Sequence, residues 1–475
     1  MVNLEHSPIV KRIAELAETT PDKVALISDA VLVTYSELLR RILAAAAFIQ
    51  SRGFKKGDCI ALTATKKFDF IFAYFGAHVA DVTVVVVDPE SNPKKMEYIL
   101  GLTKPRATLA YEDFDFESGC EPEPVADASN QDVADIVFTT GTTGNPKGVC
   151  LSHFNIYSSA SNINEFIGNG PDEVEVLGLP LCHSFGLGRL RCTLLKGATM
   201  VVVGSFANIK LFFQAIEAHK ATGFGMVPAV WAYIRKFSGT RIAKYAPQIK
   251  YIEIGSAAMP LASKKELCEL FPTTRICHHY GLTEASRSAF MEYHSAPDLN
   301  TIGKEVCDKV SIKIFNEEGN ELPQGESGEL CVKGNMVMRG YFKPEESANA
   351  YWGEYFRTGD EGYRAADGNL YLVSRKKEMI NVGGKKVSPI EVEDAVLAMG
   401  GVEDCGCVGM PDPNGILGEV PKLFVQRTGC SRTFDEIAAY LRGRLELYKQ
   451  PVAYEWIETI PKTASGKKQR LQLRK

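Results

Sequence analysis

Two hydrophobic periods alternate along the first half of the chain. Apolar residues at three- and four-residue spacing indicate helices, and short apolar runs bounded by turn residues indicate strands. Helices are predicted over 34–52, 68–79, 92–103 and 209–219, with another after Gly186. Strands are predicted over 58–63, 82–87, 108–111, 136–138, 174–179, 199–203 and 223–227. Because helices that alternate with buried strands cover the faces of a parallel sheet, this half is predicted to be α/β, with two parallel-type subdomains.

The pattern changes near Val310, where short alternating runs are separated by turn residues. Gly319-Asn320 and Asp367-Gly368 are hairpin signals, so a small β-rich lobe is predicted over about 305–374. A last α+β piece follows over 379–475. Its predicted elements are helices over 389–399 and 434–445 and strands over 405–409 and 422–426.

Composition and charge narrow the functional classes. The chain has 475 residues, too many for one core, and its net charge of −4 argues against nucleic acid as a partner. Its 12 cysteines lack zinc-ligand spacing, which indicates reduced thiols in a cytoplasmic protein. We expect no signal peptide at residues 1–10, and the aliphatic run over 82–87 is too short to span a membrane.

The stretch TTGTTGNPKG, residues 139–148, follows the predicted 136–138 strand. Glycines let backbone N–H groups approach phosphate oxygens, hydroxyls add donors, and Lys147 adds a positive charge. The stretch lacks the Gly-Lys-Ser/Thr ending of a P-loop, so it is interpreted as a different kind of phosphate loop.

Four further stretches carry chemistry, and each is ambiguous alone. HHYGLTEAS (278–286) combines an aromatic ring, a hydroxyl and a carboxylate, but could be a capped turn. YFRTGD (355–360) places Asp360 on a turn, where it could hold a ribose diol or form an Asx turn. The basic segment 374–396 could be a hinge or a solvated face, and the basic tail 460–475 could be a frayed end.

Taken in order, these stretches resemble the acyl-adenylate-forming enzymes: acid–CoA ligases, the adenylation domains of peptide synthetases, and firefly luciferase. The resemblance covers nearly the whole chain. Its motifs are 139–148, LPLCHSFG (179–186), YGLTE (280–284), GELCVKGNMVMRGY (328–341), 355–360, SRKKEMINVGGKKVSPIEVE (374–393) and PKTASGK (461–467). Thr140 stands where many members carry serine, and it keeps the hydroxyl.

The resemblance implies a two-step reaction that uses ATP, Mg²⁺ and a thiol. A carboxylic acid attacks the α-phosphate of ATP to give acyl-AMP and pyrophosphate, and the thiol of CoA or of a carrier protein's phosphopantetheine then displaces AMP. The β- and γ-phosphates are expected at Thr139, Thr140, Gly141, Thr142, Thr143, Gly144 and Lys147. The adenosine is expected at His279, Tyr280 and Gly281, with Tyr280 stacked on adenine, and at Asp360 and Arg375, which bind the ribose. Thr283 is expected to bond the α-phosphate and Glu284 to hold Mg²⁺.

The resemblance also implies domain alternation. The expected N-terminal domain is 1–374, the hinge is 375–378 around Lys377, and the mobile C-terminal lid is 379–475. Lys467 is expected to bridge the ribose and the reacting carboxylate in the first step. Rotation would then withdraw Lys467 and bring the Gly383–Gly384 loop to the thiol tunnel, which His183 gates unless it only lines the core.

The acyl pocket is less well defined by the sequence. The resemblance places Phe185, Arg189, Gly255, Ser256, Ala257 and Leu282 around it. Arg189 is unusual in a segment that is normally apolar, and on a helix it points about 200° away from Arg191. If Arg189 faces inward it favours an acid with a second anionic group, and otherwise both arginines lie at a solvent or interface edge. No acidic residue aligns where an α-ammonium group would bind, which argues against an amino acid.

The predicted function is therefore an AMP-forming acid–CoA ligase, acting on a small-molecule carboxylic acid as a monomer or homodimer. A free-standing ligase that loads an acyl carrier protein is the alternative. A P-loop kinase would need the Gly-Lys-Ser/Thr ending, and a non-catalytic scaffold would not need every reactive position to be filled.

Overall fold

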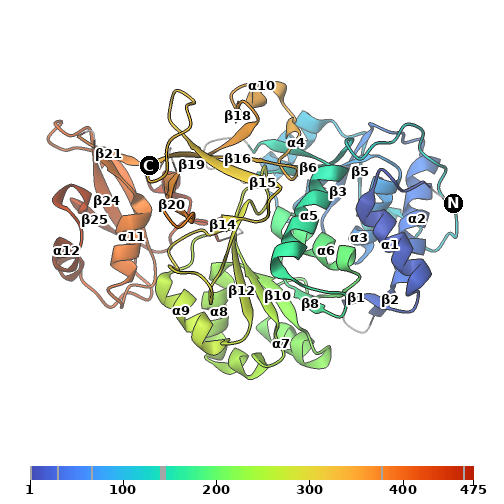
Figure 1. Cartoon of the computed structure of the whole chain (residues 1–475), viewed down its shortest axis with the longest axis horizontal. Coiled ribbons are helices and arrows are strands. Elements are labelled where there is room, and N and C mark those ends of the chain that lie inside the picture. The colour runs from blue at the N-terminus through green and yellow to red at the C-terminus, as the bar shows by residue number, and fades with distance from the viewer. Residues whose placement is uncertain are drawn as a thin grey trace.

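The computed structural model describes residues 3–28, 31–65, 68–139, 146–375, 378–383, 385–463 and 466–474. Two large sheets organise the N-terminal part, in line with the predicted α/β class, and smaller sheets follow them (Figure 1). Of the predicted site residues, Thr140 to Gly144, Lys377 and Gly384 lie outside the described residues, and so does the side chain of Arg375.

The larger of the two sheets has nine strands in the described part of the chain. Their order is β14 (Lys304–Glu305), β13 (Ala289–Glu292), β12 (Arg275–Tyr280), β11 (Tyr251–Ile254), β10 (Gly223–Met226), β8 (Val174–Leu177), β9 (Thr199–Val202), β1 (Val24–Ser28) and β2 (Val31–Thr34). The central strands run parallel, and antiparallel pairs close both edges. Parallel strands place their carboxyl ends at one edge, where ligands bind in open α/β sheets.

The second sheet carries the phosphate-loop hairpin. Its order in the described residues is β17 (Gly340–Tyr341), β7 (Gly148–Ser152), β6 (Val133–Phe138), β4 (Thr83–Val87), β3 (Cys59–Thr63) and β5 (Ala107–Leu109). β6 pairs antiparallel with β7, so the 139–148 stretch is the connection of a hairpin rather than a strand-to-helix turn. This connection separates it structurally from a P-loop, whose glycine-rich turn leads into a helix.

Helices cover both sheets, and α5 and α6 lie between them (Figure 1). The helices are α1 (Pro8–Thr19), α2 (Tyr35–Ser51), α3 (Phe68–Val79), α4 (Pro93–Thr103), α5 (His153–Ile167), α6 (Ser184–Lys196), α7 (Ile209–Ala218), α8 (Pro228–Ser238), α9 (Leu261–Leu270), α10 (Pro344–Ser347), α11 (Pro389–Leu397) and α12 (Phe434–Arg442). The oxygen of Thr34 accepts the Glu37 N–H at 3.2 Å and caps α2. No helix in the described ranges is long and apolar enough to cross a membrane.

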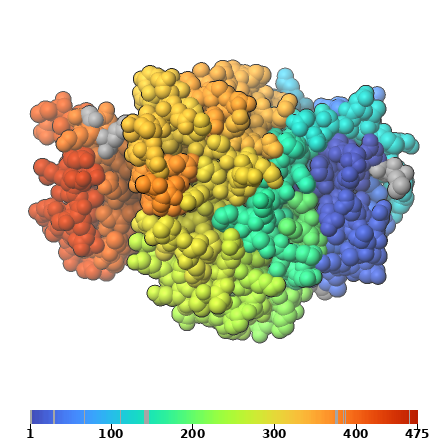
Figure 2. Space-filling model, in the orientation of Figure 1, coloured from blue at the N-terminus to red at the C-terminus, as the bar shows by residue number. Residues whose placement is uncertain are grey.

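The β-rich lobe and the C-terminal lobe complete the molecule. The first contains β15 (Val310–Phe315), β16 (Gly328–Gly334), β18 (Tyr351–Trp352), β19 (Tyr355–Arg364) and β20 (Leu370–Arg375). The second contains β21 (Ile380–Val382), β22 (Lys385–Val387), β23 (Cys405–Pro411), β24 (Glu419–Gln426) and β25 (Ala453–Ile457), with α11 and α12. Figure 2 shows this second lobe as a distinct mass at one end of the long axis.

The apolar core is divided in the same way. One cluster of buried residues runs from Ile9 to Leu370, and a second runs from Ile380 to Leu445. Because each lobe buries its own apolar side chains, neither core depends on one fixed placement of the C-terminal lobe. All 12 cysteines are free thiols.

Candidate active site

The base of the phosphate loop is held by backbone bonds between its two strands. The N–H of Thr139 donates to the carbonyl of Lys147 at 3.0 Å, and the Lys147 N–H donates to the Thr139 hydroxyl at 3.3 Å. The ammonium of Lys147 lies 4.3 Å from the centre of the Tyr341 ring. A cation over an aromatic face is electrostatically stabilised, so the Tyr341 ring holds the Lys147 side chain at the end of the hairpin where the 139–148 connection begins and ends.

Tyr341 links that hairpin to Glu284. Its phenolic oxygen donates to Oε1 of Glu284 at 2.9 Å, and Glu284 is buried. Burial and the neighbouring Glu284 carboxylate raise the pKa of Tyr341, so its hydroxyl keeps the proton that it donates. Within the described residues, Oε2 of Glu284 accepts no hydrogen bond. A carboxylate oxygen of this kind suits a hard cation such as Mg²⁺.

Tyr280 ends β12 and meets Asp360 of β19. Its phenolic oxygen donates to Oδ2 of Asp360 at 2.7 Å, and both residues are buried. Asp360 of β19 is also paired with Arg375 of β20, so the two residues predicted to bind the ribose lie at directly opposite positions of neighbouring strands. Gly281 and the half-buried Thr283 follow Tyr280 in the turn that leads to Glu284.

Beneath this turn lies a network of buried charges that sequence reasoning did not predict. Arg189 donates from Nε to Oε1 of Glu175 at 2.7 Å and from Nη1 to Oε2 of Glu253 at 2.8 Å, and all three side chains are fully buried. Arg287 donates to the same Glu253 at 3.1 Å, and Nδ1 of His279 lies 2.7 Å from it. Burial raises the pKa of Glu253, but Arg287 and Arg189 outweigh burial and hold that pKa well below its ordinary value.

This network corrects the expectation for Arg189. Its guanidinium neither enters an acyl pocket as a free charge nor lies at a solvent or interface edge, because it is saturated by two carboxylates of the protein. Arg191 is likewise buried and binds Tyr74 and Asp135. A signal for the network was present: Glu175 and Glu253 interrupt the apolar strands β8 and β11, and a carboxylate buried in a strand requires a cationic partner.

Two of the remaining pocket residues, Phe185 and Gly255, lie against the His279 ring. Phe185 packs edge-on against it with ring centres 4.8 Å apart, and a Cβ added to Gly255 would lie 2.0 Å from it. Ser256 has a positive φ of 70°, and the carbonyl of Ala257 lies 3.2 Å from Nε2 of His278. Leu282 is half-buried next to Gly281. Phe185 of α6 and Gly255 thus lie against one ring, and Nδ1 of that ring is 2.7 Å from Oε1 of Glu253.

A small cavity with both polar and apolar walls lies between α5, α6 and the Thr283 turn. It is lined by Leu151, Asn155, Ile156, Ser159, Ala160, Ser184, Gly188, Arg191, Thr283, Ser286, Arg287 and Met336. Its volume of about 20 Å³ is enough for one water molecule and too small for an organic acid.

His183 is the N-cap residue of α6. Burial lowers the pKa of His183, and its Nε2 has no hydrogen-bond partner among the described residues. Asp88 and Cys182 bring side-chain atoms to within 4.8 Å of it and of each other. Asp88 was not singled out from the sequence, although it directly follows the apolar run that forms β4.

The C-terminal lobe brings Lys467 toward the N-terminal part. The Lys467 N–H donates to the Thr463 hydroxyl at 3.1 Å, and the Thr463 N–H donates back to the Lys467 carbonyl at 2.8 Å. Gly466, at φ 80°, lies so near α8 that an added Cβ would be 3.2 Å from the Cβ of Ala229. Gly383 has a positive φ of 56° and bonds Leu417 within the lobe.

The basic tail is not a frayed end. Lys468 binds Glu393 at 2.9 Å and Asp404 at 3.0 Å, and Arg470 binds Glu393 and Glu378 at 2.7 Å each. These ion pairs hold the segment after Lys467 against the C-terminal lobe, and they thereby stabilise the turn that carries Lys467.

The structure combines a hairpin expected to hold phosphate, a partly open carboxylate at Glu284 and a lysine turn on a separate lobe. This arrangement is the one expected of an enzyme that activates an acid with ATP. The family comparison agrees: residues 13–123 and 110–342 match the AMP-binding enzyme family, and 391–467 match the AMP-binding enzyme C-terminal domain. The chain therefore belongs to the AMP-binding enzymes, as an AMP-forming acid–CoA ligase.

Named relatives span the whole chain. It is 30% identical to the long-chain-fatty-acid–CoA ligase of Bacillus subtilis, over 96% of this chain and 92% of that protein. It is 28% identical to the 2-succinylbenzoate–CoA ligase of Bacillus licheniformis, over 99% and 100%. Among solved structures, o-succinylbenzoate CoA synthetase from Bacillus subtilis with its acyl-adenylate intermediate is similar at a TM-score of 0.88 and 25% identity, over 98% of each chain. The relatives differ in the acids they are named for.

Proposed function

We propose that this ligase activates a carboxylic acid whose acyl part carries no second charge, and that CoA is the thiol acceptor. The internal pairing of Arg189 carries the proposal about the acid. A dianionic acid would need a cation in the pocket, yet Glu175 and Glu253 neutralise Arg189, and Glu253 also binds Arg287. Phe185 supplies apolar surface beside the His279 ring instead.

In the first half-reaction, the nucleotide is proposed to lie between Tyr280 and the phosphate-loop hairpin. Asp360 accepts the ribose hydroxyl protons while Tyr280 holds its carboxylate in place. Thr283 donates to the α-phosphate, and Glu284 presents Oε2 to the metal. Glu284 would hold Mg²⁺ there, and the ion would supply positive charge that lowers the repulsion between the phosphates and the incoming carboxylate. The loop residues Thr139 and Lys147 hold the pyrophosphate that leaves.

Lys467 is proposed to supply the charge on the reacting side. Its turn is supported by Thr463 and lies beside Ala229 at the start of α8, which follows β10 of the large sheet. A preorganised ammonium at the carboxylate and ribose oxygens stabilises the charge that develops in the transition state.

The second half-reaction is proposed to use a rotated C-terminal lobe. The division of the apolar core between Leu370 and Ile380 supports a hinge at 375–378 around Lys377. Rotation would bring the loop at Gly383 and Gly384 to the thiol tunnel, where His183 and Asp88 would flank the entering thiol. A carrier protein is the alternative acceptor, and the free thiols favour a cytoplasmic enzyme.

An acid panel tests the proposal. Purified protein with MgATP is offered fatty acids, aryl-propenoic acids and dicarboxylic acids, and pyrophosphate release is followed with CoA, with a pantetheinylated carrier protein, or with neither. We expect release only with acid, preference for monoacids, and acyl transfer to CoA. Preference for a dicarboxylic acid would contradict the proposed acid class, and transfer to the carrier alone would contradict the proposed acceptor.

A further inference from the structure

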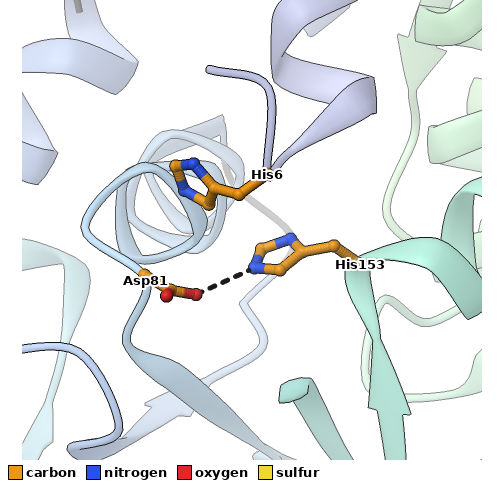
Figure 3. A group of neighbouring side chains, drawn as sticks. All are labelled: His6, Asp81 and His153. Carbon is orange, nitrogen blue, oxygen red and sulfur yellow. Dashed lines mark ion pairs between the residues drawn. The ribbon is translucent and has the colours of Figure 1, made fainter. Parts of the chain in front are cut away.

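A second constellation of ligand atoms lies away from the active site, within the N-terminal part. His6 precedes α1, Asp81 follows α3, and His153 is the first residue of α5. Figure 3 shows the three side chains converging on one point. One ligand atom from each lies within 4.8 Å of the others, and their exposed fractions are 3%, 3% and 1%.

The side chains of Asp81 and His153 lack hydrogen-bond partners in the described part of the chain. Neither carboxylate oxygen of Asp81 and neither ring nitrogen of His153 makes a hydrogen bond within the described residues. A buried polar group without a partner costs about 1–3 kcal/mol, and more if it is charged. Nε2 of His153 and Oδ1 of Asp81 therefore face each other without a hydrogen bond between them, which indicates room for an electrophilic partner.

The spacing suits a tetrahedral metal. Nε2 of His153 lies 3.4 Å from Oδ1 of Asp81 (Figure 3). Ligands about 2.0–2.1 Å from a tetrahedral Zn²⁺ lie about 3.3–3.4 Å apart, so this pair already has the edge length of a zinc site. Two imidazole nitrogens and one carboxylate oxygen suit Zn²⁺ and its neighbours Co²⁺ and Ni²⁺, whereas Mg²⁺ and Ca²⁺ prefer oxygen ligands only.

Surrounding groups orient the ligands. Nε2 of His6 lies 3.0 Å from the backbone carbonyl of His78 and donates to it, which leaves the Nδ1 lone pair for a metal. Metal-bound histidines commonly donate their other N–H in this way. Lys56 lies 3.7 Å from Oδ2 of Asp81 and 2.7 Å from Asp132, so it approaches the carboxylate from the Oδ2 side and leaves Oδ1 toward His153.

We propose that His6, Asp81 and His153 form a structural binding site for Zn²⁺ or a similar divalent transition metal. His153 directly follows β7, whose Ser152 pairs with Val133 of β6. That rung is the end of the hairpin opposite the phosphate loop. A metal there would join the N-terminal segment, the end of α3 and the base of the hairpin, and would leave one tetrahedral corner for solvent.

Metal uptake by the full-length protein tests the site. Protein treated with chelator is exposed to ZnCl₂, desalted and analysed for metal, and its melting temperature is measured with and without zinc. We expect about one zinc per chain and a rise of roughly 2–5 °C when zinc is about 100 times its dissociation constant. His6→Gln and Asp81→Asn should each abolish both effects. The proposal would be overturned if the wild-type protein retained no zinc, or if both variants retained as much zinc as the wild-type protein.

The Asp88, Cys182 and His183 group is the competing site, and Cys182→Ser distinguishes the two. Zinc uptake should survive Cys182→Ser if His6, Asp81 and His153 bind the metal, and loss of uptake would refute the assignment. Cobalt gives a readout that needs no variant. Co²⁺ bound to nitrogen and oxygen ligands should show visible tetrahedral bands without a thiolate charge-transfer band, whereas a thiolate band would assign the metal to Cys182 instead.

Discussion

Tyr280 donates a hydrogen bond from its phenolic oxygen to Oδ2 of Asp360 over 2.7 Å. The bond joins β12 of the large sheet to β19 of the β-rich lobe, 80 positions later. It couples the ring expected to stack on adenine with the carboxylate expected to bind ribose. A change in one residue should therefore alter the binding of both parts of the nucleotide.

Tyr280→Phe should keep the stacking ring and remove this bond. Because hydrogen bonds to charged groups contribute about 1.5–3 kcal/mol, we expect the KM for ATP to rise by roughly 10-fold or more, with little change in kcat. Initial rates at varied ATP and saturating acid measure the effect. An unchanged KM for ATP would show that the bond does not position Asp360.

Lys467→Ala should separate the two half-reactions. We expect acyl-AMP formation to slow by about 10²–10³, while thioester formation from supplied acyl-AMP stays near the wild-type rate. Lys462→Ala, in the same tail and 38% exposed in its pair with Asp404, is the matched control and should change neither rate. Equal losses in both half-reactions for Lys467→Ala would refute its assignment to the first step.

Two variants of Tyr341 separate its contacts with Glu284 and Lys147. Tyr341→Phe removes the 2.9 Å bond to Glu284 but keeps the ring beneath Lys147, whereas Tyr341→Leu removes both contacts. We expect the first variant to raise the half-saturating Mg²⁺ concentration several-fold, and the second also to raise the KM for ATP. Identical magnesium and ATP profiles for both variants would contradict separate contributions.

The nucleotide motifs and the buried charge network beneath them differ in how far the sequence could predict them. Tyr280, Glu284 and Asp360 lie in short motifs whose residue types, taken in order, indicate nucleotide chemistry. The alternating pattern predicted the β-rich lobe that carries Asp360, but it did not predict β12, which carries Tyr280. α3, for example, has the predicted bounds Phe68–Val79. Local periodicity determines such elements, so they can be inferred without knowing their neighbours.

The partners of buried charges could not be predicted from local patterns in the sequence. Arg189 meets Glu253 from 64 positions away, and no local pattern states which buried carboxylate a buried arginine will find. α5 was missed because Asn and Ser residues lower its helix propensity, although Ser152 and Asn155 cap it reciprocally. The catalytic and binding roles expected of the site residues stay predictions, and Thr140 to Gly144, Lys377 and Gly384 also lie outside the described ranges.

Arg189→Ala should destabilise the protein rather than change its acid preference. Removing one partner of a buried ion pair leaves Glu175 and Glu253 partly uncompensated, which costs about 3–5 kcal/mol. Arg235→Ala, which breaks a partly exposed pair with Glu266, should cost about 1 kcal/mol or less. Urea unfolding of both variants and the acid panel measure the two effects. A changed acid order at near-wild-type stability would place Arg189 in the pocket after all.

His278 should make the protein sensitive to acid. Burial lowers its pKa to about 3, and the nearby Lys264 and His279 act in the same direction. Below about pH 6.5 the His278 imidazole is protonated in the unfolded chain but stays neutral in the folded protein. The free energy of unfolding therefore falls as the pH drops from about 6.5 toward 3. In His278→Gln the loss between pH 6.5 and 5 should shrink by up to about 2 kcal/mol, measured by urea unfolding against a pH 8 baseline. Parallel curves for the two proteins would contradict this assignment, because the acid loss would then come from other groups.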